Sequence, residues 1–347
     1  MSPDVEEVVR RELDAVSAEV TPRPEWTAAV LTGLEHEQAK VRRRRLASVV
    51  AAAAVVALVV VVVGARGAGR PQPAPEPDRT TRHQMVDIGG RSLGLSCWGV
   101  SPAGTPTVVL ETGLGGHAAT YDEVRADLAD ELRVCTYDRA GTGQSHAANS
   151  FPRTARTLSD DLAALVEAGG LGRSIVLVTD GFTALSGAVF AGDHPELVTG
   201  LVFLDPRGPH VSRAEARALG EPAPGEVELV TELRSQYRTD SLSRNGEQVS
   251  YPASEAEVAA LLDAPGPAFG ATPVVVLSPA LGRQALPPLP GAIRSRWWQA
   301  WQADQDLLAS ESTSGAVRDV PEVSGSLAAS APTWVSRAVR EVAGLER

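Results

Sequence analysis

The sequence predicts an α/β fold, in which a mostly parallel sheet carries helices on both faces, preceded by one transmembrane helix. Two observations lead to this prediction. Short apolar stretches suited to buried strands alternate with stretches suited to helices, which is typical of parallel sheets. Nearer the N-terminus, residues 46–65 form an uncharged apolar run. With 347 residues, the chain is long enough for one large α/β domain and additional segments.

The N-terminal part of the chain has the pattern of a membrane anchor. Residues 1–45 carry apolar side chains at near-helical spacing, so we expect short cytoplasmic helices there. Residues 46–65 fit a bilayer core of about 30 Å, and the alternatives are a cleaved signal peptide and a buried helix of a soluble protein. Lys40 and the arginines at 42–45 precede this run, which predicts a single-pass cell-membrane protein with a cytoplasmic N-terminus and an outer domain.

A proline-rich linker is expected after the span, at residues 66–82. Proline alternates there with small or polar residues, a pattern that favours an extended, semi-rigid spacer. The whole chain has 32 Lys and Arg residues against 43 Asp and Glu residues, which gives a net charge of −11. This acidic balance argues against nucleic acid as a partner, so we expect the membrane and an unknown small-molecule or protein ligand instead.

Four blocks of sequence follow one another in the remaining chain. The first is Thr105–Gly116, with Leu-Glu-Thr-Gly-Leu-Gly-Gly at its end, and the second is Leu132–Ser145, with Tyr-Asp-Arg-Ala-Gly-Thr-Gly-Gln-Ser. A strand, turn and helix at Ile175–Leu185 and a helix end and strand at His194–Pro206 complete the series. In this order the blocks resemble the α/β-hydrolase family. The resemblance implies that residues 83–347 form a domain with that family's fold.

The resemblance places the family's nucleophile in the third block. Active members have Gly-x-Ser-x-Gly at this turn, because small residues flank a serine in a strained backbone conformation. Here the five positions are Thr179 to Thr183, so Gly181 occupies the place of the serine. A shifted register would put Asp180 there, as in the branch of the family that uses aspartate. The register without a gap favours Gly181.

The family's histidine is also absent at its expected place, and only a candidate for the acid remains. No histidine follows His210, and the alignment puts Ser326 at the position of the family's histidine. A hydroxyl does not accept a proton near neutral pH as imidazole does, so Ser326 cannot act as the general base. Asp205 remains as a candidate retained acid, although a carboxylate that ties down the loop at Pro206 is an equal alternative.

Backbone amides at the same place are the family feature expected to survive. In active relatives an oxyanion is bound by the amide after the nucleophile and by one from the loop after the third strand. These amides belong here to Phe182 and to Leu114 or Gly115. The residues expected to border the pocket are His117, Asp180, Thr183 and His210.

A relocated nucleophile is the alternative to an inactive site. Its hydroxyl would come from one of four residues near strand ends, namely Ser145, Thr179, Thr183 and Ser186. His117, His146 or His210 would then act as the base. A histidine in a loop is more often a solvated polar residue than a base.

The two cysteines are candidates for a disulfide. The resemblance places Cys97 on the family's second strand and Cys135 on its fourth, which are neighbours in the usual sheet order. Neighbouring strands lie about 4.8 Å apart, which suits a bridge between opposite residues. Two buried free thiols are the alternative. No cluster of metal ligands accompanies them, so neither a metal nor a cofactor is expected.

Residues 206–271 lie between two core strands, and we expect them to form a short helical lid over the pocket. Trp297, Trp298 and Trp301 are expected on a helix that packs in the core or against this lid. The leading hypothesis is a membrane-anchored, catalytically inactive hydrolase homologue that binds a ligand or partner. The alternatives are a serine-type esterase with a relocated nucleophile and a structural scaffold.

Overall fold

The computed structural model describes residues 82–345, apart from 101, 223–227, 229, 232–241, 245–246, 281–289, 322 and 324. The expected cytoplasmic segment at 1–45, the expected span at 46–65 and most of the linker lie outside the described residues. Within the described part of the chain, no helix is both long enough and apolar enough to cross a bilayer.

One eight-stranded sheet organises the domain, with the strand order β1-β2-β4-β3-β5-β6-β9-β10. Strands β1 and β2, and β2 and β4, pair antiparallel, and the remaining neighbours pair parallel. The bounds are β1 Arg82–Asp87, β2 Ser92–Trp98, β3 Thr107–Glu111, β4 Arg133–Tyr137, β5 Ile175–Asp180, β6 Val198–Leu204, β9 Val274–Pro279 and β10 Gly315–Val320. The mostly parallel sheet confirms the predicted fold class.

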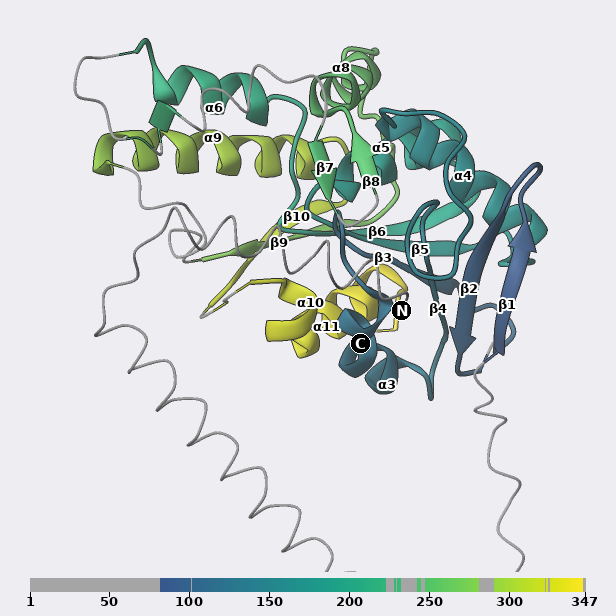
Figure 1. Cartoon of the computed structure of the whole chain (residues 1–347). Coiled ribbons are helices and arrows are strands. Elements are labelled where there is room, and N and C mark those ends of the chain that lie inside the picture. The colour runs from purple at the N-terminus through teal and green to yellow at the C-terminus, as the bar shows by residue number, and fades with distance from the viewer. Residues whose placement is uncertain are drawn as a thin grey trace, which may run out of the picture. The chain divides into compact units, whose positions relative to one another are not determined.

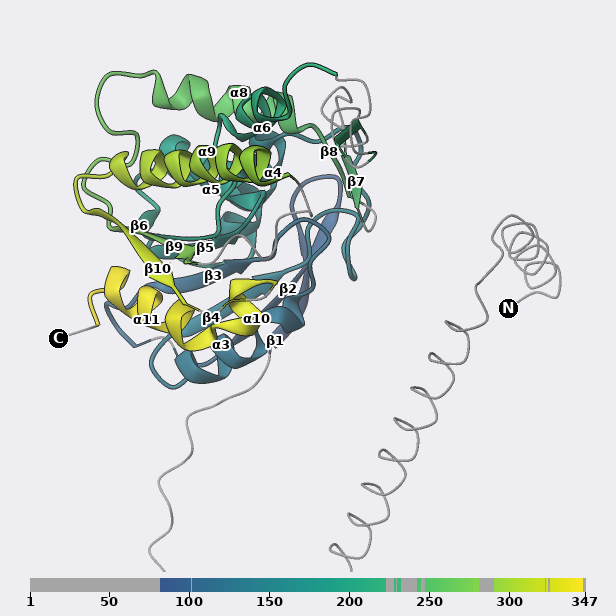
Figure 2. The ribbon, with the colours of Figure 1, turned by 90° about the vertical axis from the view of Figure 1, so that its left-hand side faces the viewer.

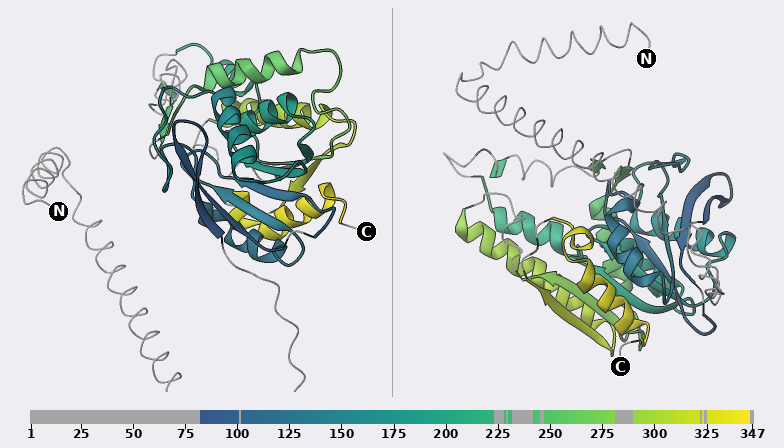
Figure 3. Two further views of the ribbon diagram at one scale, coloured as in Figure 1. Left: turned by 90° about the vertical axis from the view of Figure 1, so that its right-hand side faces the viewer. Right: turned by 90° about the horizontal axis from the view of Figure 1, so that it is seen from below.

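Helices cover both faces of this sheet (Figures 1 and 2). On one face lie α4 Ala155–Ala168, α5 Thr183–Asp193, α6 Val211–Leu219, α8 Tyr251–Leu262 and α9 Gly291–Ser310. On the other lie the 3₁₀ helix η1 Ala118–Tyr121, α3 Asp122–Leu128, α10 Leu327–Ser330 and α11 Pro332–Val342, as Figure 3 shows from below. The central strands are therefore buried on both sides, and their sequences are nearly continuous runs of β-branched and aliphatic residues.

Local sequence signals begin several of these helices. Thr154 caps α4 with its side chain, which accepts a hydrogen bond from the amide of Thr157, and the Thr157 hydroxyl accepts one from the amide of Thr154. Ser250 caps α8 by accepting from the amide of Ala253, and a proline occupies the first turn. The expected helix carrying Trp297, Trp298 and Trp301 is α9.

The segment 206–271 contains α6, a small hairpin and α8. The hairpin pairs β7 Leu242–Arg244 with β8 Glu247–Val249 in an antiparallel register. Its β8 strand also bridges to Arg153 in the loop before α4, so the hairpin is attached to the sheet-bearing part of the domain. A hairpin was not among the sequence-based expectations for this segment.

The carboxyl ends of β3, β5 and β6 lie side by side. Glu111 at the end of β3 pairs with Thr179, and Asp180 at the end of β5 pairs with Leu204. Because parallel strands end at the same edge, the loops that follow them converge there, which is where ligands bind in open α/β sheets. Residues from well-separated parts of the sequence thus meet in one place.

Candidate functional site at the turn between β5 and α5

A tight turn between β5 and α5, called the elbow below, comprises residues 179–183 and is centred on Gly181. Its φ is +60°, in the left-handed region that glycine adopts without steric cost. The amide of Gly181 donates to the carbonyl of Leu204 at 2.9 Å, and its carbonyl accepts from the amide of Arg207 at 2.9 Å. A Cβ added at Gly181 would meet no heavy atom within 4 Å. The turn therefore has room for a side chain that the sequence does not supply.

Asp180 is the last residue of β5 and pairs with Leu204 of β6. The residue with the left-handed conformation of the turn is the next one, Gly181. Its carboxylate Oδ2 accepts a hydrogen bond from the hydroxyl of Ser326 at 3.0 Å. A Cβ on Gly113, in the loop after β3, would lie 3.5 Å from the Asp180 carboxyl carbon. Asp180 thus lies between the elbow, the loop after β3 and the residue aligned with the family's histidine.

Burial decides the protonation of this carboxyl group. It raises the pKa of Asp180 to about 6; the Ser326 hydrogen bond opposes the shift, and the negative charge of Asp205 adds to it. Thr183, the first residue of α5, bonds to the backbone of Asp180, with its Oγ1 3.1 Å from both the amide and the carbonyl. The Thr183 hydroxyl therefore stabilises the elbow backbone.

Asp205 follows β6 and has a φ of +41°, the positive value that aspartate tolerates better than most residues. Its Oδ1 accepts hydrogen bonds from Trp301 Nε1 at 2.8 Å and from Gln305 Nε2 at 3.0 Å, both on α9. Burial raises the pKa of Asp205, and these two donors oppose the increase. The carboxylate ties the loop after β6 to α9, which is the structural alternative considered from the sequence.

The loop after β3 has its amide already bound by an internal carboxylate. The amide of Gly115 donates to Glu247 Oε2, on β8, at 2.8 Å. Arg139 holds the same carboxylate with two bonds, from Nε to Oε1 at 2.7 Å and from Nη2 to Oε2 at 2.8 Å. Arg139 Nη2 also donates to the Gly113 carbonyl at 3.0 Å. Glu247, from the 206–271 segment, therefore already accepts the hydrogen bond of the Gly115 amide in this loop.

Sequence reasoning missed this ion pair. Arg139 lies within the second sequence block, Leu132–Ser145. Nothing in the sequence marks Glu247 as its partner, since the two are 108 residues apart. Burial alone would lower the pKa of Arg139, yet the hydrogen bonds and the charge of Glu247 raise it above its usual value. The guanidinium therefore remains charged at any physiological pH.

A second buried acid lies behind this pair. Glu111 Oε1 is 3.6 Å from Arg139 Nη1 and 3.5 Å from the Ser186 hydroxyl. Burial raises the pKa of Glu111 to about 7, because the opposing charge of Arg139 only partly compensates for the loss of water. Phe182, whose amide was the other predicted oxyanion donor, is buried and stacks on Tyr251 of α8 with ring centroids 4.8 Å apart.

Comparisons with known proteins agree with this architecture. The family described as "alpha/beta hydrolase fold" matches residues 106–313. The chain belongs to the α/β hydrolase family. RutD of Klebsiella pneumoniae (strain 342), which its name describes as a carbamate hydrolase, is 33% identical over 109 residues, 30% of this chain and 41% of RutD. The uncharacterized protein YqjL of Bacillus subtilis (strain 168) is 32% identical over 100 residues, 29% of this chain and 39% of YqjL.

These matches span about two fifths of the length of the curated relatives. Among solved structures, a thermophilic esterase from Thermogutta terrifontis superposes with a TM-score of 0.50 at 20% identity, covering 75% of this chain and 97% of the esterase. Identity at this level shows the shared fold alone.

The residues considered for a relocated nucleophile are mostly engaged in holding the α/β hydrolase fold together. Ser186 is buried and donates to the Thr183 carbonyl at 2.9 Å. Ser145 donates to the Asp138 carbonyl at 2.5 Å, and Thr179 is fully buried. Among the described residues, no hydrogen bond joins any of these hydroxyls to a histidine.

The three candidate histidines have different surroundings. His117 is exposed at the start of η1, and Nδ1 of His146 is 3.2 Å from the amide of Ser92, within hydrogen-bonding distance. His210, by contrast, has a carboxylate partner, because its Nδ1 lies 3.0 Å from Asp304 Oδ1 on α9. Nothing in the sequence indicated that this histidine and carboxylate are paired, since they are 94 residues apart.

The cysteines form the predicted disulfide. Cys97 on β2 and Cys135 on β4 are directly opposite in the antiparallel register, with Cα atoms 4.1 Å apart. The prediction that they lie on neighbouring strands is confirmed. In the part of the chain that the structure describes, no group of three or more His, Cys, Asp or Glu residues is arranged to hold a metal ion.

Proposed function

We propose that this protein is a membrane-anchored member of the α/β hydrolase family that binds a ligand or partner outside the cytoplasm without hydrolysing it. The observation that carries the proposal is the elbow at Gly181. Its backbone has the left-handed conformation of a nucleophile turn and open space beside it, but it bears no nucleophilic atom.

The place of the general base supports the same conclusion. The Ser326 hydroxyl donates a hydrogen bond to the Asp180 carboxylate, so it acts as a donor at this site. The sequence contains no histidine after residue 210. A hydroxyl introduced at Gly181 would therefore lack an imidazole to activate it.

The oxyanion-binding side supports it as well. A reacting carbonyl oxygen would have to compete with the Glu247 carboxylate for the Gly115 amide. That carboxylate is held by two bonds from a buried arginine, so its displacement would leave Arg139 in the interior without its main carboxylate partner. The segment 206–271, which supplies Glu247 and the Tyr251 ring, would act as a lid closed over the elbow.

The anchor rests on the sequence. Residues 46–65 have the length and composition of a membrane span, and the basic residues before them place the N-terminus in the cytoplasm. Two measurements test this topology: resistance of the protein to alkaline extraction from membranes, and activity of an alkaline phosphatase fused after residue 347. Extraction at high pH, or an inactive fusion with an active cytoplasmic reporter, would contradict it.

Covalent trapping tests the absence of catalysis. The full chain, purified in detergent and checked by circular dichroism, would be treated with a fluorophosphonate probe and with a carbamate probe, the latter because relatives are named as carbamate hydrolases. We expect no labelled residue in peptide mass spectrometry, while an active esterase added to the same sample is labelled. Stoichiometric labelling of one residue would refute the proposal.

One observation favours a second candidate function, a hydrolase with a relocated nucleophile. His210 and Asp304 form the base and orienting acid that such an enzyme needs. The nearest hydroxyl in sequence, that of Ser212, donates instead to Glu255 at 2.8 Å. Labelling of Ser212 in the trapping experiment, and its loss in His210→Gln, would establish this alternative.

A further inference from the structure

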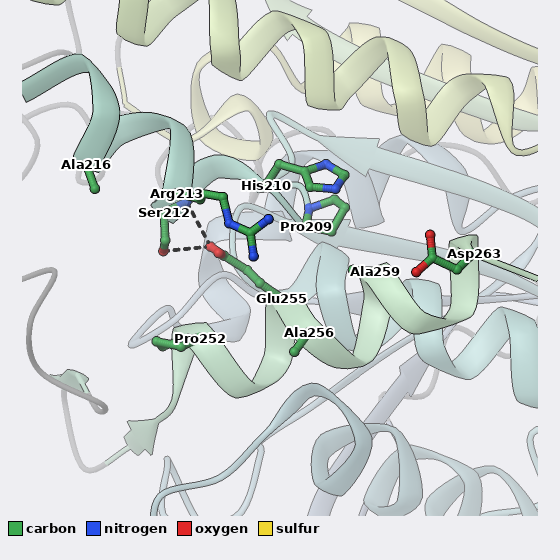
Figure 4. A pocket seen from close by; sticks show the side chains of 10 residues that line it. All are labelled: Pro209, His210, Ser212, Arg213, Ala216, Pro252, Glu255, Ala256, Ala259 and Asp263. Atoms are coloured by element: carbon green, nitrogen blue, oxygen red, sulfur yellow. Dashed lines mark hydrogen bonds between the residues drawn. The ribbon is translucent and has the colours of Figure 1, made fainter.

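A pocket of about 550 Å³ lies between α6 and α8, and none of its lining residues belongs to the turn at 179–183 (Figure 4). Its lining comes from residues 209–263 alone, with small apolar side chains on much of the wall and polar groups among them. The volume falls within the range of small-molecule sites. The lining residues used below are His210, Ser212, Arg213, Glu255 and Asp263.

His210 is fixed at the edge of this pocket by Asp304. The buried carboxylate binds the His210 backbone amide through Oδ2 at 2.7 Å and its ring Nδ1 through Oδ1 at 3.0 Å. Gly208 makes this approach feasible, because a Cβ there would lie 2.3 Å from the Cβ of Asp304. The imidazole orientation is therefore set by α9, although the histidine itself belongs to the loop before α6.

The partner of Nδ1 determines what the other ring nitrogen offers. A carboxylate only accepts hydrogen bonds, so Nδ1 carries the hydrogen and Nε2 of the neutral ring presents a lone pair. The His210 side chain is 47% exposed, while that of Asp304 is 5% exposed. A ligand in the pocket would thus meet an oriented hydrogen-bond acceptor.

The charged side chains around the pocket differ in whether they bond to other residues of the protein. Glu255 does, because Oε1 accepts from Arg207 Nε at 2.9 Å and from the Ser212 hydroxyl at 2.8 Å. Arg213 and Asp263 are exposed, and no side-chain hydrogen bond or ion pair joins either to another described residue. In Figure 4 Arg213 extends from the start of α6, and Asp263 stands at the far end of α8. One positive and one negative group therefore border the same pocket.

We propose that this pocket binds a small zwitterion, a free amino acid, whose carboxylate pairs with Arg213 and whose ammonium group donates to Asp263 and to Nε2 of His210. The small apolar wall would accept its side chain. The ammonium supplies the donors that His210 and Asp263 lack, and the carboxylate matches the planar fork of the guanidinium. The residues that line this site are not those of the turn at Gly181, and the proposal does not depend on the absence of hydrolysis there.

Calorimetric titration of the full chain in detergent tests the proposal, with L-alanine, L-serine and L-leucine as the probes. We expect saturable binding of at least one of them. Its N-acetyl derivative, which lacks the ammonium, and its amide, which lacks the carboxylate, should each bind about tenfold more weakly or worse. The absence of binding by all three amino acids, or equal binding of either derivative, would overturn the zwitterion site.

Variants locate the binding site. Arg213→Gln and Asp263→Asn should each weaken binding about tenfold or more. Arg217→Gln, on the same helix outside the pocket, and Asp160→Asn, exposed on α4, are the matched controls and should bind as the parent does. Unchanged affinity in both pocket variants, with folding verified by circular dichroism, would place the ligand elsewhere and refute the proposal.

Asp304 is a positioning residue in this scheme, and its role has its own readout. In ¹⁵N spectra of the histidine ring, the parent should show hydrogen on Nδ1 of His210. Asp304→Asn should move the ring toward the Nε2–H tautomer and weaken amino-acid binding, because Nε2 would then no longer accept. Hydrogen on Nε2 in the parent would contradict the assignment of Nε2 as the acceptor, and an unchanged tautomer in Asp304→Asn would contradict the positioning role of Asp304.

Discussion

The elbow at Gly181 and the pocket between α6 and α8 differ in backbone conformation and in how their polar side chains are bonded. The elbow has the backbone of a hydrolase site, with a left-handed turn and convergent loops, but its polar groups bond to one another. The pocket lacks that backbone, yet it has an oriented imidazole and two charged side chains facing open space. The comparison shows that the polar groups at the turn bond within the protein, whereas two charged side chains at the pocket are exposed.

The difference follows from burial. Charges enclosed at the elbow, such as Arg139 and Glu247, need each other, because an unpaired charge in the interior is costly. Arg213 and Asp263 at the pocket are exposed to water and therefore need no internal partner. Each of the following predictions tests this contrast between a closed polar network and an open one.

Glu247→Ala should have the largest effect on stability. It leaves Arg139 buried without its main carboxylate partner, which should reduce the free energy of unfolding by about 3–5 kcal/mol. Urea-induced unfolding followed by tryptophan fluorescence measures this loss. The control is Glu196→Ala, whose side chain is 58% exposed and whose effect should stay within about 0.5 kcal/mol. Similar values for the two variants would mean that the elbow network is not closed.

Glu111 should make stability depend on pH. Its folded pKa of about 7 lies above the ordinary value of 4.5, so the folded state holds the proton more firmly. The corresponding stability is present below about pH 4.5 and is lost as the pH rises toward and through 7. Relative to the parent, Glu111→Gln should therefore gain about 2–3 kcal/mol in unfolding free energy between pH 5 and pH 8. Parallel curves for the two proteins would show that Glu111 is ionised throughout.

Gly181→Ser should cost about 1 kcal/mol, because a residue with a Cβ is strained at positive φ. Gly170→Ser is the matched control, since its φ is +61° and an added Cβ there also meets nothing within 4 Å. Neither variant should hydrolyse p-nitrophenyl acetate. Esterase activity in Gly181→Ser alone would mean that an existing histidine already acts as a base at the elbow.

Addition of Ser326→His to Gly181→Ser sharpens the same test. The imidazole would stand beside Asp180, which now accepts from Ser326. We expect hydrolysis above that of the single variant, and no such gain when Ser330, exposed on the same helix, is replaced by histidine instead. Equal rates in the two double variants would show that position 326 is not the place of the family's base.

The smallest effect is expected at the open pocket. Arg213→Gln and Asp263→Asn should each change the unfolding free energy by less than about 0.5 kcal/mol, since both side chains are exposed. A loss above 1.5 kcal/mol in either would indicate that the charge is structural, and the contrast with the elbow would disappear. Urea unfolding under the conditions used for Glu247→Ala gives the comparison directly.

Much of the domain could be predicted because its signals are local. Apolar runs such as Ile175–Val178 are long enough only for buried strands, and the glycine turn after them marks the start of a helix. The pairing of Cys97 with Cys135 followed from the strand order that the family resemblance implied. The hairpin at 242–249 was not predicted, because its short strands lack a clear alternating pattern.

The sequence by itself determined the α/β class, the glycine at the elbow and the absence of a histidine after residue 210, since each is a matter of residue type and order. Only the tertiary structure decided that Glu247 binds the Gly115 amide, that Ser326 donates to Asp180 and that Asp304 orients His210. These pairs join residues from about 90 to 150 positions apart, and local propensity carries no information about such contacts. They depend on which loops the parallel strands bring to one edge and on the residues that pack against those loops.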